Sequence, residues 1–84
     1  MITKAKYLHD YLIEVVFNDR TTRVIDLEDF FKNHTWVSAR KFAPLNRFKQ
    51  FRVEDGTLCW GDNECEINPY YIYEGKYDAQ LEYA

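Results

Sequence analysis

The stretch Tyr11-Leu-Ile-Glu-Val-Val-Phe17 constrains the fold more than any other part of this sequence. β-Branched and aromatic residues dominate it, and such residues favour extended strands. Alternate side chains of a strand lie on opposite faces, so every second residue from Tyr11 shares one face, and Leu12, Glu14 and Val16 share the other. Both faces are mostly apolar. The sequence therefore predicts that this strand lies in the middle of a sheet.

Two segments are predicted to flank this central strand. Residues 2–8 form a first strand that ends in a turn at His9-Asp10. Asn18-Asp19 predicts a hairpin, because Asn and Asp tolerate the positive φ of a primed turn, and residues 21–27 then return antiparallel. The first third of the chain is therefore expected to be a three-stranded meander.

The rest of the chain predicts a hairpin and short helical segments. Asp55-Gly56 is a hairpin signal between strands at 51–54 and 57–60. Helical turns are expected at 27–32 and at 45–50, with a loop at 33–38 between them. We expect Asp26 to cap the first turn, and Pro44 to occupy the first position of the second.

A last short helix is predicted after the acidic loop that follows Trp60. It begins at Pro69, preceded by Asn68 or Glu66 as a possible cap, carries the aromatic residues 70–73, and closes at Gly75. The predicted fold class is therefore α+β, with an antiparallel sheet made of a three-stranded meander plus a C-terminal hairpin, and two or three short helices. A chain of 84 residues is expected to be a single domain over 1–84, with its core at about 2–74 and a docking or frayed C-terminal tail at 75–84.

Composition predicts a cytoplasmic protein without a membrane segment. No apolar run approaches the roughly 18–20 residues that span a bilayer, and no apolar region of a signal peptide follows Met1. Cys59 and Cys65 are expected to remain thiols in such a reducing compartment, although their short separation in sequence would permit a bridge under oxidation.

Charge is unevenly distributed along the chain. Residues 1–53 hold ten Lys and Arg against six Asp and Glu, whereas residues 54–84 hold one Lys against eight acids, which gives a net charge of −3 overall. A basic half and an acidic half favour either internal pairing or head-to-tail attraction between copies, and they argue against a uniform nucleic-acid surface.

Several of these segments together resemble a known family. The residues that carry the resemblance run through most of the chain: Val16-Phe17-Asn18-Asp19, Asp26-Leu27, Phe42-x-Pro44-Leu45, Phe48, Phe51-Arg52-Val53, Trp60, and Glu66-Ile67-x-Pro69-x-x-Ile72-Tyr73. The pattern is similar to that of the small bacterial family named domain of unknown function 2442 (DUF2442), over roughly residues 2–74. Two residues depart from it, since the family usually has Gly where Arg20 stands and Asp where Glu66 stands.

The resemblance implies an α+β domain without an established activity. Family members are often encoded beside another small uncharacterised domain, in arrangements that look like toxin–antitoxin pairs. This implies a protein partner and an antitoxin-like role.

The residues themselves indicate no metal, cofactor or catalytic site. Zinc ligands usually lie two to four residues apart, whereas five residues separate Cys59 from Cys65 and twenty-four separate His9 from His34. No nucleophile, Ser/His/Asp order or glycine-rich phosphate loop accompanies the acids near Glu66. We therefore expect no enzymatic activity, no cofactor and no metal.

Two surfaces are candidates for binding macromolecules. The less favoured one is a basic segment in which cations alternate with phenylalanines, a pattern that can hold phosphates and stack on bases, but equally that of a solvated edge. Its cations are Arg40, Lys41, Arg47, Lys49 and Arg52. A nucleic-acid partner is not favoured for a chain with a pI near 5.3.

A protein partner, or a second copy of the chain in a homodimer, is favoured instead. Seven Tyr and two Trp are more than one small core easily absorbs, and these side chains are enriched at binding hot spots. The alternative is that these side chains only line the edge of a thin core, with the tyrosine hydroxyls in water. The candidate protein-interaction surface consists of Trp36, Asp62, Glu64, Tyr70, Tyr71 and Tyr73.

Overall fold

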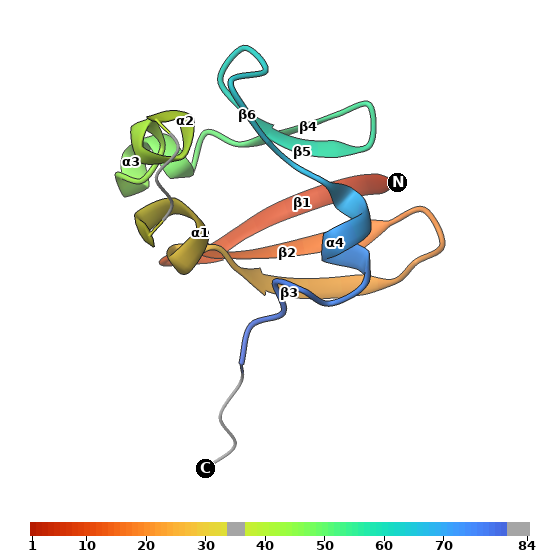
Figure 1. Ribbon diagram of the computed structural model, residues 1–84. Helices are drawn as coiled ribbons and strands as arrows, with labels where there is room; N and C mark the ends of the chain where they lie inside the picture. The colour runs from red at the N-terminus through yellow and green to blue at the C-terminus, as the bar shows by residue number, and fades with distance from the viewer. Residues whose placement is uncertain (34–36, 81–84) are drawn as a thin grey trace.

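In the computed structural model, which describes residues 1–33 and 37–80, β2 (Leu12–Phe17) is the central strand of an antiparallel sheet (Figure 1). Its neighbours are β1 (Ile2–His9) and β3 (Thr22–Asp26), in the order β1-β2-β3. Ile13 pairs with Tyr7 on one side and with Ile25 on the other. The inner face of β2 is buried and its other face is half-buried. The predicted meander and its central strand are therefore confirmed.

The hairpin between β2 and β3 differs from the prediction in its backbone. The positive φ falls on Arg20, at +71°, and not on Asn18 or Asp19. The Arg20 amide donates to the Phe17 carbonyl at 2.9 Å, and the Phe17 amide donates to the Thr21 carbonyl at 2.8 Å. The expectation of a primed turn at Asn18-Asp19 was wrong, because the left-handed residue follows the turn and is an arginine.

The second sheet also has three strands. The predicted hairpin is present as β4 (Arg52–Glu54) and β5 (Thr57–Trp60), and β5 pairs in addition with β6 (Cys65–Ile67). The segment after Trp60 was expected to be a loop up to the last helix, and β6 corrects that expectation. Its alternation of buried, exposed and buried residues is that of a strand with one face on the core.

The register of β5 and β6 separates the two cysteines. Trp60 pairs with Cys65, and Cys59 pairs with Glu66. Directly paired residues share a face and successive residues alternate, so Cys59 and Cys65 lie on opposite faces of the sheet. Both are buried free thiols. The expectation that their spacing would permit a bridge was therefore wrong.

Four short helices accompany the sheets in the described residues. They are α1 (Glu28–Asn33), α2 (Val37–Lys41), α3 (Leu45–Phe48) and α4 (Pro69–Tyr73). α1, α2 and α3 gather at one end of the molecule, and α4 lies away from them, near the N-terminus (Figure 1). α1 begins where Asp26 accepts a hydrogen bond from the Glu28 amide at 3.0 Å, as predicted.

The expected loop at 33–38 is wrong at both ends, because Asn33 belongs to α1 and Val37 and Ser38 already belong to α2. Ala39, which is fully buried, holds this helix against the core. Pro44 precedes α3 as its N-cap with extended backbone, one position earlier than predicted. Trp36 lies outside the described residues.

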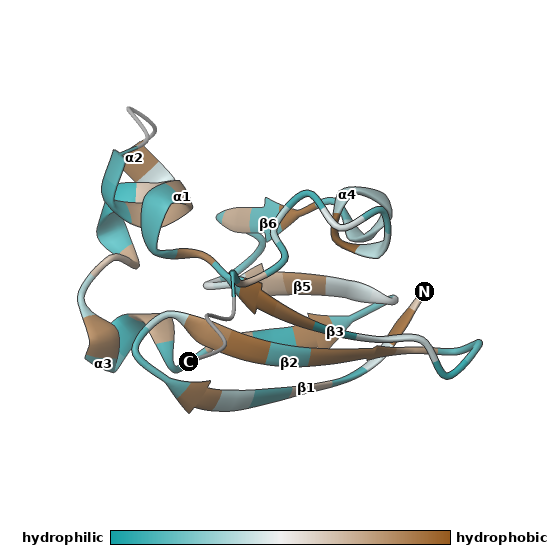
Figure 2. Ribbon diagram, turned by 90° about the horizontal axis from the view of Figure 1, so that it is seen from below, coloured by the Kyte–Doolittle hydropathy of each residue, from teal (hydrophilic) through white to brown (hydrophobic). Residues whose placement is uncertain are grey.

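The core lies between the two sheets and extends under α1 and α3 (Figure 2). Its centre is aromatic. The Phe31 ring contacts Trp60 and Phe48 edge to face, with ring centroids 4.8 and 5.2 Å apart. The buried Trp60 indole donates to the Phe48 carbonyl at 2.8 Å, which satisfies its one polar group. Trp60 therefore joins the second sheet to the helical end.

Residues 77–79 pair with the free edge of β3. The Asp26 amide donates to the Tyr77 carbonyl at 2.9 Å, and the Ala79 amide donates to the Val24 carbonyl at 2.8 Å. The Tyr77 ring lies 6.0 Å from the Phe30 ring. This part of the predicted tail is thus a docked segment that covers a strand edge, while residues 81–84 lie outside the described residues.

Candidate protein-interaction surface

α4 owes its position to signals at both of its ends. The Asn68 side chain accepts a hydrogen bond from the Tyr70 amide at 2.9 Å, and Pro69 follows as the first helical residue. At the other end Gly75 has a φ of +91°, and its amide donates to the Ile72 carbonyl at 3.1 Å. Asn68 is therefore the cap. Glu66, the other candidate for this role, lies within β6 instead.

One side of α4 is fastened to both the core and the meander. Ile72 is fully buried, and Arg23 on β3 donates to the Tyr73 carbonyl at 3.0 Å. The Tyr73 ring meets the Phe17 ring edge to face at 5.0 Å, and its hydroxyl donates to the Asp19 carboxylate. That hydrogen bond, with another from the Thr21 amide, lowers the pKa of Asp19 to about 2. Asp19 is therefore ionised at neutral pH.

α4 also presents tyrosine side chains to solvent, including the part of Tyr73 that these contacts leave uncovered. Tyr70, Tyr71 and Tyr73 are 64%, 44% and 39% exposed, and together we call them the tyrosine face. A hydrogen bond from the Tyr70 hydroxyl to the Glu74 carboxylate raises the pKa of Tyr70. The Lys76 ammonium lies 4.6 Å from the centre of the Tyr71 ring. The structure thus brings three of the six predicted interaction residues together.

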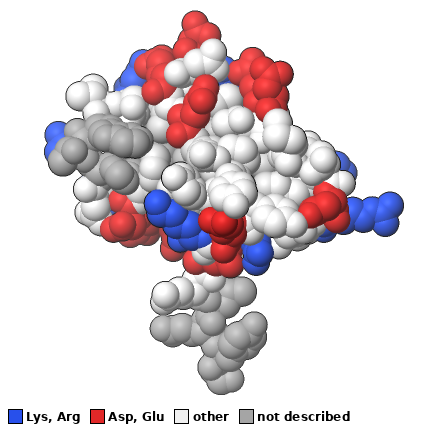
Figure 3. Space-filling view, turned by 45° about the vertical axis from the view of Figure 1, so that its right-hand side comes forward, with Lys and Arg blue, Asp and Glu red and all other residues white. Residues whose placement is uncertain are grey.

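An apolar depression borders the tyrosine face. It has a volume of about 320 Å³, and we call it the α4 groove; its lining residues are Met1, Phe17, Pro69, Tyr70 and Tyr73. On the side of the molecule seen in Figure 3, a broad area without charged side chains is bordered by Asp and Glu side chains and by several Lys and Arg side chains. None of the residues that line the groove has a charged side chain.

Asp62 and Glu64 do not belong to this surface. They lie in the turn between β5 and β6, at the end of β6 opposite to α4 (Figure 1). The Glu64 carboxylate accepts a hydrogen bond from the Lys41 ammonium at 2.6 Å, which lowers the pKa of Glu64. The predicted set is therefore split by β6, and Glu64 already has a partner within the chain.

The basic segment is also engaged within the molecule. Besides Lys41, Arg52 pairs with the Glu54 carboxylate at 2.8 Å and donates to the Gly61 carbonyl. Arg47 donates to the Lys41 carbonyl at 3.2 Å, and the Lys49 ammonium lies 5.1 Å from the centre of the Tyr7 ring. Arg40 is exposed on α2. Most of the predicted phosphate-binding groups thus already stabilise turns and helix ends.

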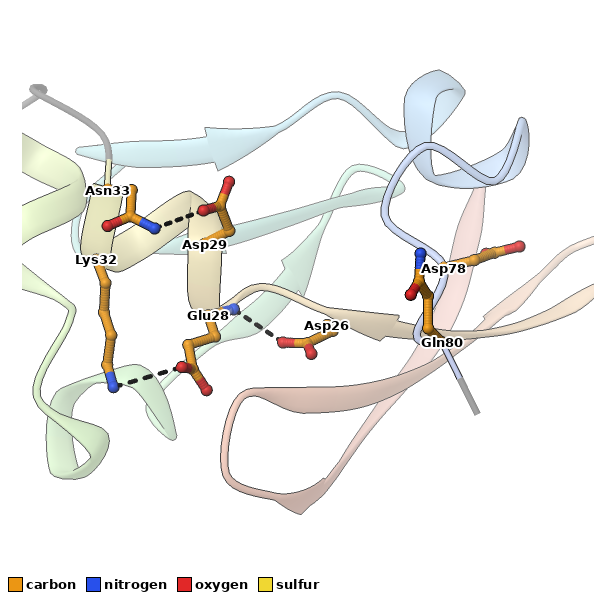
Figure 4. A pocket seen from close by; sticks show the side chains of 7 residues that line it. All are labelled: Asp26, Glu28, Asp29, Lys32, Asn33, Asp78 and Gln80. Atoms are coloured by element: carbon orange, nitrogen blue, oxygen red, sulfur yellow. Dashed lines mark hydrogen bonds and ion pairs between the residues drawn. The ribbon is translucent and has the colours of Figure 1, made fainter. Parts of the chain in front are cut away.

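A larger, polar depression of about 510 Å³ lies between α1 and residues 78–80 (Figure 4). Its side chains are Asp26, Glu28, Asp29, Lys32, Asn33, Asp78 and Gln80. The acids have structural partners: Asp26 caps α1, Glu28 lies 3.7 Å from Lys32, Asp29 accepts from Asn33, and Asp78 lies 3.5 Å from Arg23. These four carboxylates therefore already have partners within the chain.

Two further observations concern metal binding and membrane insertion. Among residues 1–33 and 37–80, no three His, Cys, Asp or Glu side chains are arranged so that they could hold a metal ion. In the same part of the chain, none of the helices has the length and apolar character needed to cross a membrane.

A family model described as "Protein of unknown function (DUF2442)" matches residues 2–78. The chain belongs to the DUF2442 family. Searches of curated proteins and of solved structures gave no significant match. For this DUF2442 domain, the match covers both sheets and all of α4.

Two residues of the α4 groove in this DUF2442 domain could not be found by sequence reasoning. Met1 and Phe17 lie more than fifty residues before α4. In the sequence, Met1 was only the residue before the first strand, and Phe17 was the last residue of the central strand. The inward position of Phe17 follows from the alternation along β2. Its contact with Tyr73 depends on where α4 docks, and no local pattern encodes that position.

Proposed function

We propose that this chain is a small cytoplasmic protein-interaction domain that binds a protein partner, or a second copy of itself, through the tyrosine face. The observation that carries the proposal is the exposure of three tyrosines on one short helix that is itself rigidly fastened by Ile72 and Tyr73. Tyrosine offers a large contact area with only two rotatable side-chain bonds, so its ordering on binding costs little entropy.

The antitoxin-like role implied by the family resemblance is one form of such an interaction. It requires a stable complex with one protein, and the tyrosine face with the α4 groove supplies an apolar centre of the kind that such interfaces use. The structure gives the alternative function, nucleic-acid association, less support, because Lys41 and Arg52 are paired with carboxylates.

The test compares three forms of the chain as bait in its own host's lysate, combined with light scattering on the purified protein. The forms are the wild type, the double variant Tyr70→Ala/Tyr71→Ala, and Thr22→Ala as a control at an exposed position of β3. We expect the wild type and the control to retain the same protein or to form a dimer, and the double variant to lose this association. A monomer at high micromolar concentration that retains no protein contradicts the proposal, and so does equal retention by all three forms.

A further inference from the structure

The α4 groove differs from the polar depressions around it in what it can bind. Its lining is formed almost entirely by carbon, from the side chains of Met1, Phe17 and Pro69 and the rings of Tyr70 and Tyr73. The two tyrosine hydroxyls are directed to carboxylates, Tyr70 to Glu74 and Tyr73 to Asp19. The groove is therefore suited to an apolar side chain and offers no polar group to a small polar ligand.

The walls of the groove are firmly held. Phe17 is buried and fixed by β2, and its ring packs against Tyr73, which Asp19 and Arg23 hold from two sides. The Met1 side chain lies against Gly56, where an added Cβ would come within 2.3 Å of the methionine Cε. A preformed groove loses little entropy when it is filled, so even one apolar side chain can contribute to affinity.

The rim of the groove carries negative charge. Glu74 and Asp19 accept the hydroxyls of its two tyrosines, and Asp55 is exposed in the turn beside Gly56. Arg20 is exposed next to Asp19, and the Met1 ammonium donates to the Asn18 side-chain oxygen at 3.3 Å, so two cations oppose these three acids. The rim therefore keeps an excess of one negative charge. An occupant that places cations around its apolar side chain is therefore complementary to the groove.

The same charges argue against other occupants. Two copies that met through the same groove would bring their Asp19 and Glu74 carboxylates together, and like charges across an interface are unfavourable. A nucleic acid or an anionic lipid surface would be repelled for the same reason.

We propose that the α4 groove receives an apolar side chain flanked by Lys or Arg residues from a segment of a different protein. This inference rests on the proposed function, since it names the chemistry of the partner that the tyrosine face binds. The apolar side chain fills the space between Phe17, Pro69 and Tyr70, and the flanking cations pair with Glu74 and Asp19 at the rim.

The experiment titrates the ¹⁵N-labelled chain with the peptide acetyl-Lys-Lys-Leu-Leu-Lys-Lys-amide and follows amide shifts by NMR. Two further peptides serve as comparisons, one with Ala in place of Leu and one with Glu in place of Lys. We expect shifts at Phe17, Tyr70 and Tyr73. Binding of the Ala peptide should be at least about tenfold weaker, since burial of a leucine side chain is worth about 1.5–3 kcal/mol. The Glu peptide should not bind.

Variants of the chain locate the site. Tyr70→Ala should weaken the binding of the Lys-Leu peptide about tenfold, whereas Thr22→Ala, at an exposed position of β3 outside the groove, should leave its affinity unchanged. Glu74→Lys should weaken it to a similar extent and should reduce the loss of affinity caused by added salt. Far-UV circular dichroism checks that each variant is folded.

The outcomes separate this inference from the proposed function. Equal binding of the Lys and Glu peptides, shifts outside the groove, or no binding at millimolar peptide overturns the groove proposal. If the tyrosine double variant still loses a partner that the wild type retains, the proposed function stands without it. If neither the peptide nor any protein binds, both proposals fail.

Discussion

At the scale of single residues, Arg20 is the clearest case of local strain. It occupies the left-handed region with a φ of +71°, where a residue with a Cβ costs about 1–2 kcal/mol and glycine does not. The family usually has glycine here. The cost is tolerated because the hairpin hydrogen bonds between Phe17, Arg20 and Thr21 hold the backbone in this conformation.

Replacing Arg20 with Gly should therefore stabilise the protein. We expect a gain in the free energy of unfolding of about 0.5–1 kcal/mol, because the relief of strain exceeds the additional entropy that glycine loses on folding. Urea unfolding of Arg20→Gly and wild type measures the difference. Asn18→Gly is the matched control: its φ is not positive, so it should give no gain. A loss of stability in Arg20→Gly would show that the arginine side chain contributes more than its backbone costs.

The low pKa of Asp19 predicts how the stability of the protein changes at acidic pH. Its folded pKa of about 2 lies below the ordinary value of 3.8, chiefly because of the hydrogen bond from Tyr73. A depressed pKa contributes stability that is fully present above about pH 4 and is lost as the pH falls toward 2. The stability advantage of the wild type over Asp19→Asn should thus be constant from pH 7 to 5 and shrink between pH 4 and 2. Urea unfolding at pH 6, 4 and 2.5 measures it, and a constant difference would contradict this role.

At the scale of elements, α4 is too short to persist without its cap and its docking contacts. A helix of five residues gains little from its own hydrogen bonds, so the Asn68 side chain and buried Ile72 decide whether it forms. The tyrosine face exists only while this helix is intact. Its stability and its capacity to bind are thus linked.

Asn68→Ala should lower the free energy of unfolding by about 1 kcal/mol, because the Tyr70 amide loses its acceptor. Asn68→Asp should retain most of the stability, since a carboxylate accepts the same hydrogen bond and is favoured at a helix N-terminus. Thermal unfolding followed by circular dichroism compares the two variants. Equal stability of the Ala and Asp variants would mean that Pro69 alone fixes the start of the helix.

The elements that the sequence predicted are those with strong local signals. β2 is rich in β-branched residues, and Asp55-Gly56 sets the hairpin of β4 and β5. β6 was missed because three residues that include Glu66 give too short an alternation beside an acidic turn. The failure to predict β6 also explains why the candidate surface included residues that lie apart in the structure. Without β6, Asp62 and Glu64 seemed to adjoin the tyrosines, whereas the strand places them at its other end.

At the scale of the whole molecule, the division into a basic and an acidic part is bridged internally. Lys41 and Glu64 come from the two parts, as do Arg23 and Asp78. The pairing favoured by the charge distribution is therefore partly intramolecular. Fewer cations remain available to a polyanion than the sequence suggested.

We accordingly expect no binding of a 20-base-pair DNA duplex at 150 mM NaCl, as measured by fluorescence anisotropy. Only weak retention at 50 mM NaCl is expected, because phosphate contacts depend strongly on salt. Glu64→Gln, which releases Lys41, is expected to increase that retention, and Lys41→Ala to decrease it. Binding at 150 mM NaCl that is lost in Arg47→Ala would instead favour the nucleic-acid function.

The order in which the two sheets occur along the chain affects when the protein can fold during its synthesis. The meander is complete at Asp26, but its apolar face is covered by residues of the second sheet and α4, up to Ile72. At roughly 5–20 residues per second, a ribosome needs several seconds to synthesise this cover. During that interval the nascent chain exposes a hydrophobic sheet that is only marginally stable. This domain therefore cannot complete its fold until the chain has been synthesised as far as Ile72.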